Sequence, residues 1–169
     1  VQMGRVYSAA NFGNENVVPS ILVLDEALLK FGQVRVRIYR HIVNTDDKAM
    51  AEIETSIEQS RHGVEEALKK YEPLVIDAED KKLLEEDKAT LAKYSEAIKP
   101  LLELSRNNRN DEARAMANEV AKVARHLNDA LEAHMKFNAD LGKKTSEEAV
   151  AAKQFATWSS LAVSALAIL

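Results

Sequence analysis

One short stretch of the sequence, residues 30–41, concentrates side chains that could bind an anion. No Asp or Glu occurs over residues 27–45, and the stretch carries four cations and a histidine: Lys30, Arg35, Arg37, Arg40 and His41. Guanidinium groups fit carboxylates with two parallel hydrogen bonds, so this pattern predicts a site for a small anion. The alternative is a solvent-exposed helix end, because basic side chains are favoured near a helix C-terminus.

The composition of the chain indicates a helical domain. Its 169 residues include five Gly, three Pro and no Cys, and its formal net charge is -4. A chain of this length can bury a core, and so few turn-forming residues are typical of a few long helices. The absence of Cys excludes disulfides, thiol chemistry and Cys-ligated metals. The negative charge and the lack of a basic stripe argue against a nucleic-acid partner.

Apolar residues spaced three and four apart predict four helices. We expect them over about residues 20–44, 46–71, 77–105 and from 110 onward, with residues 1–16 only weakly helical because of their Gly and Asn content. Asp46 and Asp77 are the expected N-caps or turn residues. Three short turns make sequential helices antiparallel. The fold class is therefore an all-α, antiparallel up-down-up-down four-helix bundle with long first and fourth helices.

Arg35 falls within the apolar seam expected for the first helix. The members of that seam follow helical spacing: Ile21, Leu24, Leu28, Phe31, Arg35, Ile38 and Ile42. A buried charge without a partner is costly, so Arg35 should have a partner or face an interface or a cavity. Arg37 and His41, four residues apart, share a second face of the same helix.

The remaining polar residues give no enzyme pattern. No Glu-x-x-His, Gly-rich phosphate loop, or Ser-His-Asp arrangement is readable, so we predict no catalysis, no metal and no cofactor. His126 and His134 are expected to be surface or packing histidines. The acidic run over residues 85–87 is expected to be a solvated face.

The end of the chain differs from the rest. Residues 155–169 carry no charge, and Trp158 would suit a membrane interface. A spanning helix needs roughly 20 apolar residues, so the segment reads as the start of a truncated transmembrane helix. We therefore predict a ligand-binding domain at residues 1–154 and this membrane segment at residues 155–169. The alternative is a buried C-terminal helix of the bundle.

The chain has a long first helix, three short turns, a long fourth helix and an expected membrane segment, in that order. In this order it resembles the periplasmic four-helix-bundle ligand-binding domain of bacterial methyl-accepting chemotaxis proteins. The resemblance covers nearly the whole chain. It is carried by the Asn-rich start with Tyr7 and Pro19, by HIVNTDD at residues 41–47, by KYSEAIKPLLEL at residues 93–104, and by the closing residues 145–169. The resemblance implies a receptor of the bacterial inner membrane with this domain in the periplasm. It also implies membrane helices that flank the domain, a homodimer packed through the first helix, and a displacement of the fourth helix that controls chemotaxis.

The resemblance also implies a ligand site on the half of the first helix that lies far from the membrane. Arg35, Arg37 and Arg40 occupy that region and are assigned to the site as a group. His41 is added because it shares a face with Arg37, and Tyr94 because it points inward from the third helix. The expected ligand is a di- or tricarboxylate such as malate, succinate or citrate, since the stretch offers no acid to accept an ammonium group.

Two alternatives remain open at the level of the sequence. The bundle could be the sensor domain of a histidine kinase or a cyclase instead of a chemoreceptor. It could also be a membrane-anchored helical module that mediates assembly without sensing, in which case the arginines would pair with acids on a second copy.

Overall fold

The computed structural model describes residue 4, residues 7–8 and residues 11–168, with residues 160–168 described through their backbone alone. Nearly all of these residues are helical, and no strand occurs among them. The elements are a π-helical turn η1 (Gly13–Val17), α2 (Val18–Ile42), α3 (Asp47–Tyr71), a short 3-10 helix η2 (Glu72–Leu74), α4 (Ala78–Arg106) and α5 (Asn110–Ile168). The predicted all-α fold with four main helices is confirmed.

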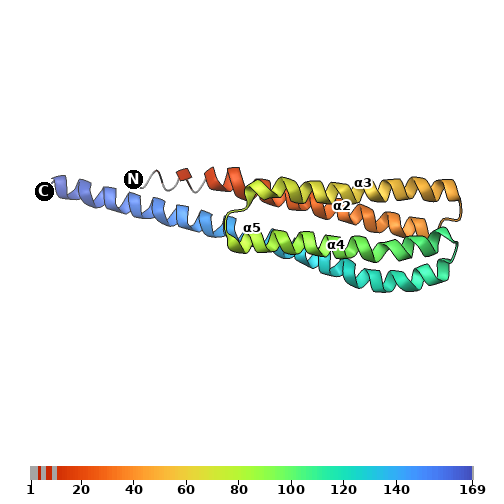
Figure 1. The fold of residues 1–169 in the computed structure, drawn as a ribbon. Helices are drawn as coiled ribbons and strands as arrows, with labels where there is room; N and C mark the ends of the chain where they lie inside the picture. Colours follow the sequence, from red (N-terminus) through yellow and green to blue (C-terminus); the bar gives the residue numbers. More distant parts are fainter. Residues whose placement is uncertain (1–3, 5–6, 9–10, 169) are drawn as a thin grey trace. The chain divides into compact units, whose positions relative to one another are not determined.

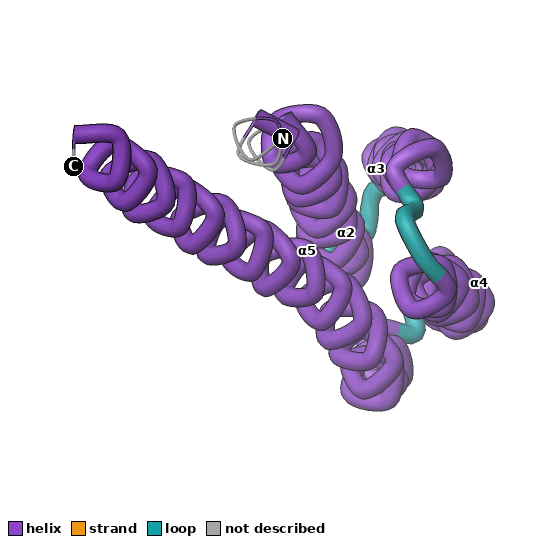
Figure 2. The backbone as a smooth tube through the Cα atoms, turned by 90° about the vertical axis from the view of Figure 1, so that its left-hand side faces the viewer, coloured by secondary structure: helices purple, strands orange, loops and turns teal. Residues whose placement is uncertain are grey.

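The chain divides into two compact units. Residues 22–135 form one, here called the bundle unit, and residues 1–21 with 136–169 form the other, here called the end unit. In the bundle unit, α2, α3, α4 and the first part of α5 lie side by side and alternate in direction (Figure 1). Figure 2 shows the four helices grouped around a common interior.

The helix ends follow local capping chemistry. Asp46 accepts a hydrogen bond from the Ala49 amide at 2.7 Å, and Asp77 accepts one from the Asp80 amide at 2.9 Å. Each bond satisfies an amide that the first helical turn leaves without a partner. The turn into α5 contains Asn108 with φ of 54°, the only non-glycine residue with positive φ in the described part of the chain. Asn tolerates this left-handed conformation better than most residues. The predicted N-caps at both positions are confirmed.

The core of the bundle unit is a continuous apolar interior with one aromatic pair at its centre. The rings of Phe31 and Tyr94 meet edge to face, with centroids 5.0 Å apart and an interplanar angle of 85°. The core side of α2 passes through Val34, which is buried, while Arg35 is exposed. The prediction that Arg35 occupies the core seam is therefore wrong. Both residues fit a three-or-four spacing from Phe31, and the uncharged side chain is the one that can be buried without a partner.

The first helix begins earlier than the sequence suggests, and its first residues belong to the end unit. Residues 11–42 are helical without a break, so the expected weak helicity of residues 11–16 is wrong. Pro19 has no amide hydrogen and its ring crowds the carbonyl four residues before it. The π-turn at Gly13–Val17 lies directly upstream and widens the helix there, a common local adjustment to such interruptions. The other residues of the expected weak stretch lie largely outside the described residues.

A close approach in the end unit accounts for Gly142. A Cβ atom at this position would lie 2.8 Å from Cγ1 of Val17. Since Val17 is buried and stiff at its branched Cβ, only a residue without a side chain fits here.

None of the helices in the described part of the chain combines the length and the apolar character that a membrane crossing requires. The side chains of residues 160–169 lie outside the description, so the membrane segment at residues 155–169 stays a prediction.

Candidate functional site

Arg35 and Tyr94, two of the predicted site residues, line one small pocket of the bundle unit. Tyr39 lies beside them, and α5 contributes a wall of small residues. The lining residues come from α2, α4 and α5: Arg35, Ile38, Tyr39, Tyr94, Leu101, Ala117, Val120, Ala121 and Ala124. None of these side chains is acidic. The wall from α5 contains Ala117, Ala121 and Ala124, which recur at every third or fourth position of that helix.

Arg35 and Tyr94, two polar residues of this pocket, have no hydrogen-bond or ion-pair partner in the part of the chain that the structure describes. The Arg35 guanidinium lies over the Phe31 ring, 5.9 Å from its centroid, and Arg35 forms no ion pair or hydrogen bond with the described residues. The Tyr94 hydroxyl likewise has no hydrogen-bond partner among them. Burial raises the pKa of Tyr94, against the opposing effect of the nearby Arg35 charge. Tyr94 therefore stays a neutral donor, which suits an anionic acceptor.

The pocket is too small to enclose an organic acid. Its volume is about 20 Å³, which is room for about one water molecule. A carboxylate could be held at the mouth of the pocket, where Arg35 and Tyr39 are exposed.

The other predicted site residues point elsewhere. Arg37 donates from Nη1 to the backbone carbonyl of Ser56 at 3.0 Å, so it joins α2 to α3. Arg40 is exposed and makes no hydrogen bond or ion pair with the described residues. The structure thus brings Arg35 and Tyr94 together and leaves Arg40 unpaired on the surface of α2.

His41 is fully buried and belongs to a cross-link of α2, α3 and α4. Its Nδ1 lies 2.8 Å from Ser105 Oγ, and its Nε2 lies 2.9 Å from Glu54 Oε1. The Ser105 hydroxyl donates to the His41 carbonyl at 3.0 Å, so Nδ1 must be the donor toward Ser105 Oγ. Arg106 holds Glu54 with two hydrogen bonds, and this pairing lowers the pKa of Glu54 despite partial burial. Both ring nitrogens of His41 are therefore occupied within the chain.

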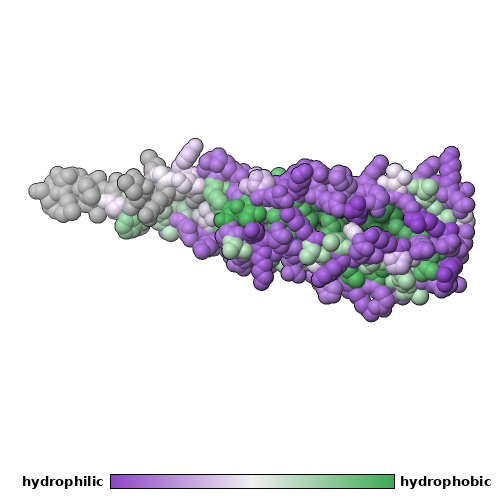
Figure 3. Space-filling model, in the orientation of Figure 1, coloured by the Kyte–Doolittle hydropathy of each residue, from purple (hydrophilic) through white to green (hydrophobic). Residues whose placement is uncertain are grey.

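An exposed apolar stripe on α2, with its last member Val43 just after the end of the helix, lies next to the pocket. Its main members recur every seven residues and are all about two-thirds exposed: Leu22 at 63%, Leu29 at 60%, Val36 at 61% and Val43 at 67%. Tyr39, at 55%, extends the stripe. The sequence carried the signal for this stripe, because a seven-residue apolar repeat is typical of a helix that packs against another helix. The face drawn in Figure 3 is mainly hydrophilic over the bundle unit, with apolar residues showing between the helices.

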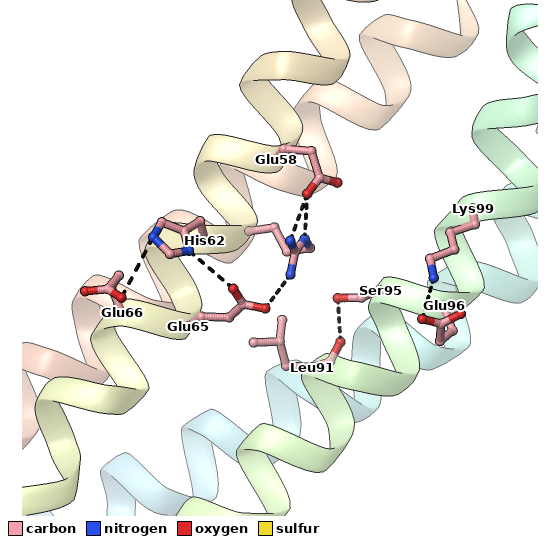
Figure 4. Close-up of polar contacts among 9 residues, drawn as sticks. Glu58, His62, Glu65, Glu66, Leu91, Ser95, Glu96 and Lys99 are labelled. Carbon is pink, nitrogen blue, oxygen red and sulfur yellow. Dashed lines mark hydrogen bonds and ion pairs between the residues drawn. The ribbon is translucent and has the colours of Figure 1, made fainter.

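Cations on the α3–α4 face contrast with Arg35 because they are paired locally. Arg61 binds both Glu58 and Glu65, and Lys99 binds Glu96 at 2.6 Å. Figure 4 shows these pairs lying along their own helices. Such surface pairs contribute little to stability, typically below about 1 kcal/mol. A larger groove of about 830 Å³ lies between α4 and α5. Its lining contains both acidic and basic side chains, including Glu79, Lys82, Glu86, Lys93 and Asp129.

Sequence reasoning missed one buried polar cluster. Asp87 was expected on a solvated face, but it is completely buried against His134, which is also completely buried. The expectation for Asp87 is wrong because the acidic run 85–87 turns one of its three members inward on α4. Across the described part of the chain, no group of three or more His, Cys, Asp or Glu side chains is placed to hold a metal ion.

Comparison with known proteins places the chain in a family. No curated protein matches it. Residues 8–152, most of the chain, match the family described as a four helix bundle sensory module for signal transduction. The match agrees with the observed helices and with the resemblance to chemoreceptor sensor bundles. The chain belongs to this family of four-helix-bundle sensory modules for signal transduction.

Proposed function

We propose that this chain is the periplasmic sensory domain of a bacterial chemoreceptor and that it binds a small di- or tricarboxylate between two copies of itself. It acts without enzymatic activity, in a receptor held in the inner membrane by flanking helices. The observation that carries the proposal is the arrangement of unpaired Arg35 and Arg40 beside the exposed stripe of α2. The family supports the sensory role, and the two arginines support the ligand class.

The stripe supports a homodimer packed through α2. Leu22, Leu29, Val36 and Val43 occupy one core position, called a, of a seven-residue repeat. Tyr39 then falls at the second core position, called d. An exposed row of this kind is buried most simply against the same row of a second copy, as in a coiled coil.

The same repeat places the two arginines at the edges of that interface. Arg35 falls at position g and Arg40 at position e, the positions that flank the a and d seam. In a parallel pair, a g residue lies beside the e residue five positions later on the other helix. Arg35 of one copy therefore lies beside Arg40 of the other, and the symmetry of the pair creates this arrangement twice.

Two adjacent guanidinium groups repel each other unless an anion lies between them. The corresponding pair one repeat earlier on α2 carries no such repulsion, because Leu28 faces Gln33 there. A dicarboxylate at the mouth of the Arg35 pocket could bind both guanidinium groups and accept a bond from Tyr94 or Tyr39. Each charge-assisted hydrogen bond adds roughly 1.5 to 3 kcal/mol, so two bidentate pairs suffice for micromolar affinity after the costs of association.

The first test is a thermal-shift and calorimetric screen with malate, succinate, citrate and a set of amino acids. Binding of one carboxylate class should raise Tm, and Arg35→Gln and Arg40→Gln should each lose the shift. Arg37→Gln removes the same charge from the same helix and is the matched control. Because its guanidinium is bound to the Ser56 carbonyl, this variant should keep most of the ligand-dependent shift.

A mixing experiment tests whether the site lies between copies. An equimolar mixture of Arg35→Gln and Arg40→Gln chains forms mixed dimers in which one of the two sites retains both arginines. The mixture should therefore regain ligand binding that neither variant shows alone. If mixing restores nothing, the site does not use one arginine from each copy. If Tm responds to protein concentration but to none of the acids, the bundle is an assembly module instead.

A further inference from the structure

A buried cluster of four polar side chains links α3, α4 and α5 in the bundle unit. The Tyr71 hydroxyl donates to Asp80 Oδ1 at 2.7 Å, and the Ile76 amide donates to Asp80 Oδ2 at 3.0 Å. His134 Nε2 lies 2.9 Å from Asp80 Oδ1, and its Nδ1 lies 2.6 Å from Asp87 Oδ2. Asp80, Asp87 and His134 are at most 1% exposed. The Tyr71 ring also packs on the imidazole, with centroids 4.4 Å apart.

The hydrogen bonds of this cluster determine where protons can be held. Both nitrogens of His134 face carboxylate oxygens, and only the doubly protonated ring can donate to both. Asp80 already accepts from Tyr71 and from a backbone amide, as an ionised carboxylate does. Asp87 differs, because its Oδ1 is buried and has no hydrogen-bond partner. An imidazolium between two carboxylates leaves one negative charge in excess, and Asp87 Oδ1 is the place where one more proton can bind.

We propose that Asp80, Asp87 and His134 form a proton-binding site that makes the packing of α5 on α4 depend on pH, as a second input beside the carboxylate. A purely structural link would need only one carboxylate opposite the imidazole. The second one, with an unsatisfied oxygen, costs stability unless it is protonated, because an unpaired buried charge is unfavourable. The cluster therefore has no excess negative charge when it has gained two titratable protons: the one that makes the His134 ring positively charged, and the one on Asp87.

The surroundings of the cluster support the same direction. Burial raises the pKa of Asp87, and the hydrogen bond with His134 opposes this only in part. Burial lowers the pKa of His134, but the hydrogen bonds with Asp87 and Asp80 outweigh it and raise the pKa overall. Glu86, next in the chain, also raises the pKa of Asp87. Two surface ion pairs are formed by residues of α2, α3, η2 and α4 in this unit: Glu26 with Lys70, and Lys88 with Glu72.

Both shifts have the same consequence for stability. A raised pKa means that the folded protein binds the proton more tightly than the unfolded chain, so stability falls as pH rises. For His134, the contribution is complete below the ordinary value of 6.5 and is lost as pH rises through its raised value. For Asp87, the protonated form is favoured above the ordinary value of 3.8. Acidification should therefore tighten the contact between α4 and α5, and alkaline pH should loosen it.

The test follows the parent protein and two variants across pH. NMR of labelled histidines should show His134 losing its proton above the ordinary histidine value of 6.5. Tm of the parent should fall as pH rises from about 6 to about 9, and Asp87→Asn should lose at least half of that fall. His126→Gln is the matched control and should keep the fall of the parent. Hydrogen exchange at amides of residues 80–91 and 127–135, corrected for intrinsic rates, should accelerate at the higher pH in the parent and in His126→Gln, but not in Asp87→Asn.

Two results would overturn the proposal. One is a His134 that titrates at or below the ordinary value of 6.5, and the other is an Asp87→Asn variant with the full pH dependence of the parent. If Asp87→Asn does not fold, the histidine titration of the parent decides alone. This inference rests on the proposed function, because the pH effect would act on the output of the proposed sensor, but its test uses no organic acid. Failure of carboxylate binding and failure of the proton site are therefore distinguishable.

Discussion

Removal of the Ser105 hydroxyl should destabilise the protein far more than the size of the change suggests. In Ser105→Ala, the His41 carbonyl loses one of its donors and His41 Nδ1 loses its acceptor, at a site where both side chains are 0% exposed. A buried hydrogen bond contributes about 1 kcal/mol, and a buried donor left without a partner costs about 1 to 3 kcal/mol. We therefore expect a loss of about 2 to 3 kcal/mol in the free energy of unfolding.

The assay is urea denaturation followed by circular dichroism. With a slope of about 2 kcal/mol per molar urea, the midpoint should fall by roughly 1 M. Ser95→Ala is the matched control on the same helix, since its hydroxyl only donates back to the Leu91 carbonyl at 2.9 Å. This control should stay within about 0.5 kcal/mol of the parent. If both serine variants lose the same amount, the inference that Ser105 satisfies His41 is refuted.

Three further predictions concern the core, a helix cap and pH. Leu127→Ala, at a fully buried position, should cost about 2 to 5 kcal/mol because it removes apolar contacts and leaves a cavity, as urea denaturation would measure. Asp46→Ala should cost about 1 kcal/mol, measured in the same way, since the Ala49 amide loses its cap. Arg106 lowers the pKa of Glu54, so the contribution of this pair should be present above the ordinary value of 4.5 and disappear as pH falls, and Glu54→Gln should remove that part of the acid-induced drop in Tm.

Each of these three predictions would be contradicted by a specific result. A Leu127→Ala variant as stable as the parent would mean that the core around α5 can collapse to fill the space. An Asp46→Ala variant with unchanged stability would show that solvent replaces the cap at no cost. A Glu54→Gln variant that unfolds in acid just as the parent does would show that the Arg106 pair makes no net contribution there.

The number of main helices and the starts of α3 and α4 could be predicted from local chemistry, whereas the start of the first helix could not. Asp46 and Asp77 mark their helices because an N-cap is a short-range interaction that the sequence shows directly. The local pattern could not decide which residue after Phe31, the one three or the one four positions later, faces the core. Val34 and Arg35 both satisfy the helical period, and periodicity alone does not take into account the cost of burying the charge of Arg35.

The candidate site was predictable only where it depended on a single helix. The unpaired cations of α2 were visible as a stretch without acids, and the seven-residue stripe was present in the same residues. Ser105 lies 64 residues from His41 and Asp87 lies 47 residues from His134, and no local pattern connects these pairs. For the same reason Asp87 was taken as a solvated residue. A side chain that is stabilised by a distant partner looks, in the sequence, like any other acid on a charged helix.

The contact between His41 and Ser105 also has a consequence for the order of folding events. The two residues close a loop of 64 positions, whereas α3 and α4 meet through a short connection over residues 72–77. Each doubling of loop length adds about 0.6 kcal/mol of closure entropy, so the hairpin of α3 and α4 should form first. A contact made after the rate-limiting step affects the unfolding rate more than the folding rate. Ser105→Ala should then unfold faster and fold at nearly the speed of the parent, so this hydroxyl prolongs the lifetime of the folded bundle without helping to form it.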